Sequence, residues 1–113
     1  MPDRLAARVV LIDRDDCVLL LSGRESTDPN GRQFWFTPGG GAEDGESIVD
    51  AAGREVFEET GFKLGEIGPC VWTRHAVFEF EGRRYSQDEQ YFVVRVERFE
   101  VRRPSRPRLK LAR

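Results

Sequence analysis

Two apolar runs near the N-terminus predict a pair of β-strands. Residues 5–12 (LAARVVLI) and 17–23 (CVLLLSG) have the length of strands, and the polar cluster at 13–16 separates them. Short apolar runs on either side of a polar turn are typical of a hairpin. Because both runs are apolar at nearly every position, we expect this hairpin to be buried on both faces.

Further along the chain, the pattern predicts three more strands. Residues 24–33 (RESTDPNGRQ) are rich in turn formers and predict a loop, after which a short strand at 34–37 leads to Pro38 and three glycines. Residues 71–81 and 90–101 are rich in β-branched and aromatic residues, which alternate in places with polar ones. This composition is typical of strands. Strands therefore dominate the chain outside one helical segment.

Residues 47–60 form the one segment with the period of an α-helix. At about 100° per residue, its apolar side chains fall on one arc and three glutamates fall on the adjoining arc. Ser47 suits the N-cap position, and Gly61 stands where a left-handed residue commonly ends a helix. The apolar arc holds Val49, Ala52, Val56 and Phe57, and the acidic arc holds Glu55, Glu58 and Glu59.

The acidic arc suggests a role other than stability. Carboxylates spaced i, i+3 and i+4 repel one another, by roughly a few tenths of a kcal/mol for each exposed pair. Glutamates near the end of a helix also oppose its macrodipole. A hard divalent cation, which takes oxygen ligands, would turn this repulsion into binding. A solvated acidic helix face is the alternative, and the three glutamates alone do not decide between the two.

The spacing of these residues within 40–62 (GGAEDGESIVDAAGREVFEETGF) carries a family resemblance. It resembles the Nudix box of the Nudix hydrolases, G-x5-E-x7-R-E-U-x-E-E-x-G-U, where U is a bulky apolar residue. The preceding WFTPGG is similar to the family's approach strand and turn. Every constrained position of the box is matched, by Gly40, Glu46, Arg54, Glu55, Val56, Glu58, Glu59, Gly61 and Phe62.

The resemblance implies an α/β fold, a Nudix-type α/β/α sandwich around a mixed β-sheet. It also implies an enzyme that uses Mg²⁺, with Mn²⁺ as an alternative ion, to hydrolyse a pyrophosphate bond in a nucleoside diphosphate linked to another moiety. In such a site Glu58 and Glu59 are the main metal ligands, and Glu55 is a ligand or the general base. The Gly40 carbonyl completes the metal shell, and Arg54 orients the glutamates.

Residues outside these positions are weaker candidates. Gly39 and Gly41 would let the backbone approach the metal and the phosphates closely. Trp35 could stack on a base and Arg74 could clamp a phosphate, although strand aromatics are often core residues and surface arginines are often only solvated. Glu46 suits a structural role beside the helix N-terminus. A further metal ligand from outside the box is expected at Glu97 or Glu89, and the one histidine, His75, fits a hydrogen-bonded strand residue better than a base.

The C-terminus departs from the family pattern. The chain has a formal net charge of −2, yet residues 102–113 contain only basic charges and two prolines. Proline disfavours helix, so the C-terminal helix expected of this family is missing or shortened. We therefore predict a Nudix hydrolase domain at 1–101 followed by a basic Pro/Arg-rich tail at 102–113. An uncovered sheet face usually marks an interface, so we also predict a homodimer.

Length and composition argue against several other classes of protein. A chain of 113 residues suits one domain, and it has no membrane-length apolar run or signal-peptide pattern. Cys17 and Cys70 are isolated, which fits free thiols in a cytoplasmic protein. The acidic body disfavours nucleic-acid binding, although the basic tail leaves RNA 5′-end hydrolysis as one alternative. The other is a catalytically weak Nudix-like module that binds or senses nucleotides.

Overall fold

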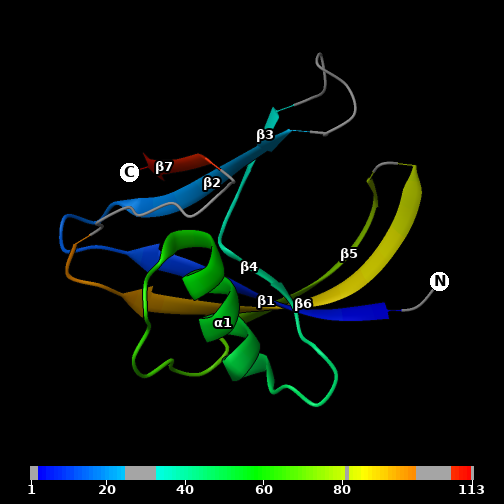
Figure 1. The fold of residues 1–113 in the computed structure, drawn as a ribbon, viewed down its shortest axis with the longest axis horizontal. Helices are drawn as coiled ribbons and strands as arrows, with labels where there is room; N and C mark the ends of the chain where they lie inside the picture. The colour runs from blue at the N-terminus through cyan, green and yellow to red at the C-terminus, as the bar shows by residue number, and fades with distance from the viewer. Residues whose placement is uncertain (1–2, 25–32, 81, 99–107, 113) are drawn as a thin grey trace.

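The computed structural model describes residues 3–24, 33–80, 82–98 and 108–112, which form seven strands and one helix (Figure 1). A single mixed sheet contains all seven strands. In chain order the elements are β1 Asp3–Ile12, β2 Val18–Arg24, β3 Gln33–Phe36, β4 Gly39–Gly41, α1 Ile48–Thr60, β5 Trp72–Phe80, β6 Arg83–Arg95 and β7 Arg108–Ala112.

The strand order β3-β2-β1-β6-β5 places the N-terminal strand in the middle of the sheet. β1 runs parallel to β6, from the pair Asp3↔Ser86 to the pair Ile12↔Arg95. All other pairings are antiparallel, so the expected mixed sheet is confirmed. β4 pairs with residues 6–8 of β1, which brings the glycine strand to the centre of the sheet.

The core lies between the sheet and α1, which crosses one sheet face in Figure 1. Side chains at alternate positions of a strand point to the same face, so every second residue of β1 faces the helix. Val56 and Ala52 of α1 meet these residues in the core. The buried cluster consists of Ala7, Val9, Leu11, Leu19, Ala52, Val56, Phe92 and Val94.

The ends of α1 match the capping signals in the sequence. The Ser47 hydroxyl accepts a hydrogen bond from the Asp50 backbone N–H at 3.0 Å, which satisfies one donor of the first turn. Gly61 adopts the left-handed conformation with φ of 82°, and its N–H donates to the Phe57 carbonyl at 2.9 Å. The prediction of a helix between Ser47 and Gly61 is therefore confirmed.

The second half of the sheet differs from the prediction at both ends of the expected C-terminal strand. β6 begins at Arg83 rather than at residue 90, because Gly82, with φ of 80°, turns the chain directly back along β5. Residues 83–89 are mostly polar, yet their backbone pairs with β5 on one side and, from Ser86 onward, with β1 on the other. The strand ends at Arg95, and residues 99–101 lie outside the described part of the chain.

The predicted basic tail contains a strand that sequence analysis missed. Residues 108–112 form β7, which pairs antiparallel with β2 from Ser22↔Arg108 to Val18↔Ala112 (Figure 1). Leu109 and Leu111 alternate with polar residues there, but five residues after two prolines are too short a pattern to read with certainty. α1 is the only helix among the described residues, and it is not long and apolar enough to cross a membrane.

Candidate active site

The candidate site lies where the glycine strand β4 meets α1. β4 is held against Ala6–Arg8 of β1, and the helix packs on both strands. This arrangement follows from the glycines, because a side chain at Gly39 would place its Cβ 2.0 Å from the Ala7 carbonyl oxygen. Gly39 also has φ of 146°, a conformation that L residues rarely adopt. The chain can therefore enter the helix directly from the middle of the sheet.

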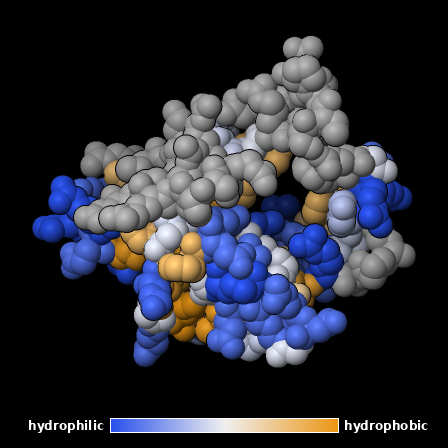
Figure 2. Space-filling view, in the orientation of Figure 1, coloured by the Kyte–Doolittle hydropathy of each residue, from blue (hydrophilic) through white to orange (hydrophobic). Residues whose placement is uncertain are grey.

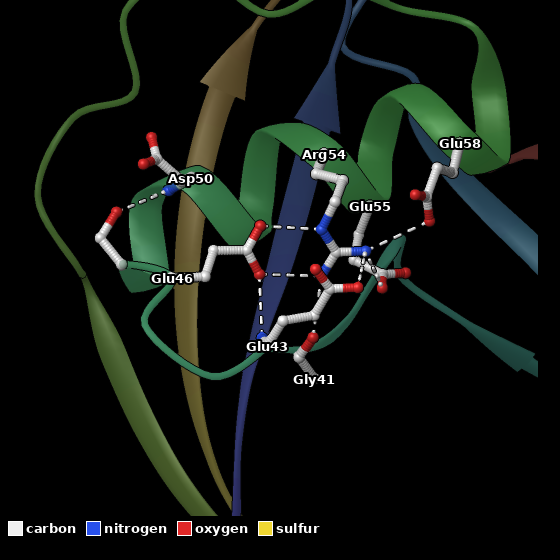
Figure 3. Close-up of polar contacts among 8 residues, drawn as sticks. Gly41, Glu43, Glu46, Asp50, Arg54, Glu55 and Glu58 are labelled. Carbon is white, nitrogen blue, oxygen red and sulfur yellow. Dashed lines mark hydrogen bonds and ion pairs between the residues drawn. The ribbon is translucent and has the colours of Figure 1, made fainter.

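Arg54 is the organising cation of this site (Figure 3). Its Nε and Nη2 donate to the two carboxylate oxygens of Glu46 at 2.8 and 3.0 Å, a bidentate pair. Its Nη1 contacts Glu55 at 3.0 Å and Glu58 at 3.3 Å, and its Nη2 also donates to the Gly41 carbonyl at 3.0 Å. One guanidinium thus ties the glycine strand to the acidic arc of the helix.

Glu46 is engaged as a structural anchor in this network. Its carboxylate also accepts a hydrogen bond from the Glu43 backbone N–H at 2.9 Å, which closes the loop before the helix. The hydrogen bonds from Arg54 are the main reason that the pKa of Glu46 falls to about 2. The same pairing raises the pKa of Arg54 above its ordinary value. These contacts support the structural role expected for Glu46.

Gly40 lies against the carboxylate of Glu55. A Cβ at Gly40 would stand 2.5 Å from Cδ of Glu55, so only glycine lets this carboxylate approach the backbone so closely. On the neighbouring residue, the Gly39 N–H donates to Oε1 of Glu59 at 2.8 Å. Two of the three glutamates of the acidic arc therefore touch the glycine strand, while Glu58 lies on the side of Arg54 away from Glu46 (Figure 3).

The pKa of Glu59 is shifted in the opposite direction from that of Glu46. Burial raises the pKa of Glu59 to about 7, and the nearby charges of Glu55 and Glu58 act in the same direction. The hydrogen bond from Gly39 and the positive charge of Arg8 lower this pKa and only partly offset the burial. A bound cation at this point would favour the ionised carboxylate.

The donors at this site fit a hard divalent cation, although they are not gathered as a finished ligand set. Glu55, Glu58, Glu59 and the Gly40 carbonyl offer only oxygen atoms, which Mg²⁺ and Mn²⁺ prefer. Among the described residues, however, no group of three or more His, Cys, Asp or Glu side chains is arranged to hold a metal ion. The reason is visible in the contacts, because Arg54 holds Glu55 and Glu58 while Glu59 turns to Gly39.

The two candidates for a ligand outside the box lie in different places. Glu97 follows β6, is exposed, and its carbonyl accepts from the Arg14 N–H at 3.4 Å, beside the turn that joins β1 to β2. The glycine strand pairs with residues 6–8 in the middle of β1, whereas Glu97 lies beyond the Ile12 end of that strand, so Glu97 is not brought to the box. Glu89 is buried, with 4 % of its surface exposed, and contacts Arg8 and Arg74.

A cavity of about 640 Å³ opens beside this site, on the sheet face away from α1. In Figure 2 hydrophilic side chains gather over α1, and a hollow is visible above it toward β5. Trp35 and Arg74, both expected to bind substrate, line this cavity together, and Trp35 is 45 % exposed. The other lining residues are Arg4, Arg8, Leu20, Phe34, Phe36, Thr37, Phe78, Gln87, Glu89 and Tyr91.

Sequence analysis did not single out several polar residues of this cavity, among them Arg8 and Gln87. Arg8 interrupts the apolar run LAARVVLI, and a charge inside a buried strand was the available signal. Gln87 lies between the strands expected at 71–81 and 90–101, so no pattern predicted its burial, which leaves it 2 % exposed. His75 binds Asp88 at 2.7 Å and Ser86 at 3.2 Å, which agrees with a hydrogen-bonded strand residue.

Comparisons with known proteins agree with the fold and the box. The family model described as NUDIX domain matches residues 2–110. Diphosphoinositol polyphosphate phosphohydrolase 2 of Rattus norvegicus is 37 % identical over 73 residues, which are 65 % of this chain and 35 % of that protein. The m7GpppN-mRNA hydrolase NUDT17 of Bos taurus is 33 % identical over 70 residues, 62 % of this chain and 23 % of that protein. The chain thus spans about a third or less of these relatives.

A solved structure extends the agreement to almost the whole chain. The MutT NUDIX hydrolase from Burkholderia pseudomallei superposes with a TM-score of 0.77 over 99 % of this chain and 84 % of that one, at 20 % identity. At this identity the match concerns the fold alone, and the fold is the one expected from residues 40–62. The chain belongs to the NUDIX domain family.

Proposed function

We propose that this chain hydrolyses a pyrophosphate bond in a nucleoside diphosphate linked to another moiety, with Mg²⁺ as its cofactor and Mn²⁺ as a substitute. The observation that carries the proposal is the partly buried Glu59, whose pKa is raised to about 7 beside two further box glutamates. Burial and mutual repulsion both disfavour the charged carboxylates at this site, and a bound cation would relieve that repulsion. The alternative of a solvated acidic face does not account for a buried carboxylate.

In this proposal Glu55, Glu58, Glu59 and the Gly40 carbonyl hold the metal. The bound ion supplies charge stabilisation to the phosphate oxygens and lowers the pKa of water. Arg54 keeps Glu55 and Glu58 in place through contacts of 3.0 and 3.3 Å. Gly39 and Gly41 keep the backbone free of side chains beside the phosphates. Glu55 serves as a ligand or as the general base that accepts the proton of the attacking water.

The aromatic cavity supports a nucleoside as one half of the substrate. Trp35, Phe34 and Phe78 line it with rings that are 45, 36 and 38 % exposed, so each has surface left for a ligand. Aromatic rings and bases stack, and each such contact contributes about 1–3 kcal/mol. The names of the relatives span a diphosphoinositol polyphosphate and an mRNA cap. The lining residues of this chain favour a base over an inositol ring.

A phosphate-release screen tests the proposal directly. Purified protein is incubated with nucleoside diphosphate sugars, dinucleoside polyphosphates, nucleoside triphosphates and a diphosphoinositol polyphosphate, with Mg²⁺ or with EDTA. We expect Mg²⁺-dependent cleavage of at least one nucleotide and weak or no cleavage of the inositol compound. Nucleotide binding without turnover of any compound would support the regulatory module instead. Preferred cleavage of the inositol compound would contradict the assignment of a nucleoside.

We also propose that the protein acts as a homodimer in the cytoplasm. Large apolar side chains are exposed on and beside β5, the last strand in the sheet order, where Val71 and Trp72 are 59 and 58 % exposed. Val77, on the same strand, is 51 % exposed. Trp72 and Val77 lie five residues apart on β5 and so point to opposite faces of the sheet, which gives this edge strand exposed apolar side chains on both sides. Exposed apolar surface of this kind commonly marks an interface. Light scattering over a concentration series distinguishes a dimer from a monomer of 13.0 kDa.

A further inference from the structure

A buried carboxylate with four partners lies on the floor of the cavity. Glu89 of β6 accepts hydrogen bonds from Gln87 Nε2 at 2.6 Å and from the Tyr91 hydroxyl at 3.2 Å. It also forms ion pairs with Arg8 Nε at 3.5 Å and with Arg74 Nε at 3.3 Å. The two arginines come from β1 and β5, on either side of β6, so three strands converge on one carboxylate.

The engagement of Glu89 leaves little capacity for a metal ion. Gln87 and Arg8 contact Oε2, while Tyr91 and Arg74 contact Oε1, so both oxygens are occupied. The carboxylate side chain is only 5 % exposed, and a buried charge that loses its partners carries a penalty of several kcal/mol. A metal ion bound to Glu89 would have to displace both arginines. It would also place its own positive charge close to theirs.

The same contacts orient the two arginines. A guanidinium has five N–H donors in a rigid plane, and both arginines turn the Nε edge of that plane toward Glu89, at 3.5 Å for Arg8 and 3.3 Å for Arg74. Two guanidinium groups beside one carboxylate leave this part of the cavity with a positive charge, and Arg4 adds to it. In the sheet, Arg8 of β1 is opposite Gly39 of β4 on one side and opposite Tyr91 of β6 on the other. The arginines around Glu89 therefore lie next to the glycine strand of the box.

We propose that Glu89 is a positioning residue, not a metal ligand, and that it holds Arg8 and Arg74 as a paired clamp for a phosphate group of the substrate. The inference rests on the proposed function, because the phosphate in question is the part of the diphosphate that faces the cavity. One guanidinium recognises a phosphate through bidentate hydrogen bonds, and two guanidinium groups held beside each other offer two such sets of donors. The clamp therefore requires Glu89 to keep both planes fixed.

The first experiment measures the binding of inorganic pyrophosphate without metal. Titrations in EDTA by calorimetry compare the wild type with Arg74→Ala, Glu89→Gln and the control Arg83→Ala, which removes an exposed arginine of β6 that does not line the cavity. Loss of one charge-assisted contact corresponds to about a tenfold weaker Kd. We expect that loss for Arg74→Ala and no more than about a twofold change for Arg83→Ala.

The sign of the effect in Glu89→Gln separates positioning from simple charge. Removal of a negative charge from the cavity would by itself tighten the binding of an anion. A positioning role predicts weaker binding, because both arginines lose the partner that orients them. We expect Glu89→Gln to weaken pyrophosphate binding, and to weaken it less in the Arg74→Ala background, where Arg8 is the one arginine left for Glu89 to orient. Tighter or unchanged binding in Glu89→Gln would overturn the proposal.

The second experiment measures turnover as a function of Mg²⁺ concentration. We expect Glu89→Gln to raise KM while the Mg²⁺ concentration for half-maximal activity stays that of the wild type. A large increase in that Mg²⁺ concentration, with pyrophosphate binding unaltered, would make Glu89 a metal ligand. If the wild type cleaves no diphosphate, the proposed function fails, and the pyrophosphate titration in EDTA still decides the clamp.

Discussion

Glu59→Gln is expected to stabilise the metal-free protein at neutral and alkaline pH. The substitution keeps the size of the side chain and an oxygen that can accept from the Gly39 N–H, whose bond to Glu59 measures 2.8 Å. It removes the negative charge that burial disfavours. The charge of Glu59 is thus expected to lower the stability of the metal-free folded state.

The magnitude follows from the pKa of Glu59, which burial raises from 4.5 to about 7. The folded state retains a proton between these two values that the unfolded chain releases, so stability falls as the pH rises through this window. At about 1.4 kcal/mol per unit, the loss amounts to roughly 3 kcal/mol as an upper limit. For a domain of this size that corresponds to roughly 10 °C in Tm.

The assay is thermal unfolding in EDTA, followed by circular dichroism from pH 5 to pH 8. We expect the Tm of Glu59→Gln minus that of the wild type to rise from roughly a quarter of its full value at pH 5 to its full value above pH 7. Glu58→Gln is the matched control, because its side chain is 55 % exposed and its contact with Arg54 is a surface pair. A difference between Glu59→Gln and wild type that does not vary with pH would refute the burial argument.

Three further expectations concern the metal, the sequence candidate outside the box, and assembly. Millimolar Mg²⁺ should raise the Tm of the wild type, since binding to the native state alone is stabilising, and overlapping melting curves would contradict a cation site. Glu97→Gln should keep turnover within about twofold of wild type, since Glu97 lies beside Arg14 and away from the box, and a large loss of Mg²⁺ affinity would restore it as a ligand. Light scattering should give the mass of a dimer for the wild type. Trp72→Glu, which places a charge at an exposed position of β5, should shift the equilibrium toward monomer. A wild-type monomer at every concentration would exclude the assembly.

The helix and the contacts along it could be predicted because their signals are local. Ser47 and Gly61 mark the ends of α1 through backbone bonds that span three or four residues. The period of the glutamates places Glu55, Glu58 and Glu59 on one arc, and the contacts of Arg54 with Glu55 and Glu58 follow from adjacency on the same helix. The spacing of the box then identified the family, as the match over residues 2–110 confirms.

The cavity could be predicted only in part because it is assembled from distant strands. Arg8, Arg74 and Glu89 are far apart in sequence, and they meet through the parallel pairing of β1 with β6 and the hairpin of β5 with β6. No local pattern encodes the parallel pairing, which depends on how the whole sheet forms. The same holds for β7, whose residues pair with β2 from the other end of the chain.

Residue type alone could not decide whether Glu89 or Glu97 reaches the cavity. Both stand near the C-terminal part of the chain in polar surroundings, and the sequence leaves them equivalent. Side-chain direction alternates along a strand, so Glu89 points into the cavity beside Gln87 and Tyr91, with which it shares a face. Glu97 follows the end of β6 and is exposed. Register, rather than residue type, decides which acid meets the arginines.

Steady-state turnover of the best substrate, with and without Mg²⁺, tests the central claim most directly when wild type is compared with Glu58→Gln. The loss of a metal ligand removes several kcal/mol of charge stabilisation, so we expect turnover to fall by at least about 100-fold while circular dichroism shows an intact fold. We expect EDTA to abolish the wild-type reaction. Turnover of Glu58→Gln near the wild-type rate, or wild-type turnover that persists in EDTA, would contradict a metal-dependent Nudix site on α1.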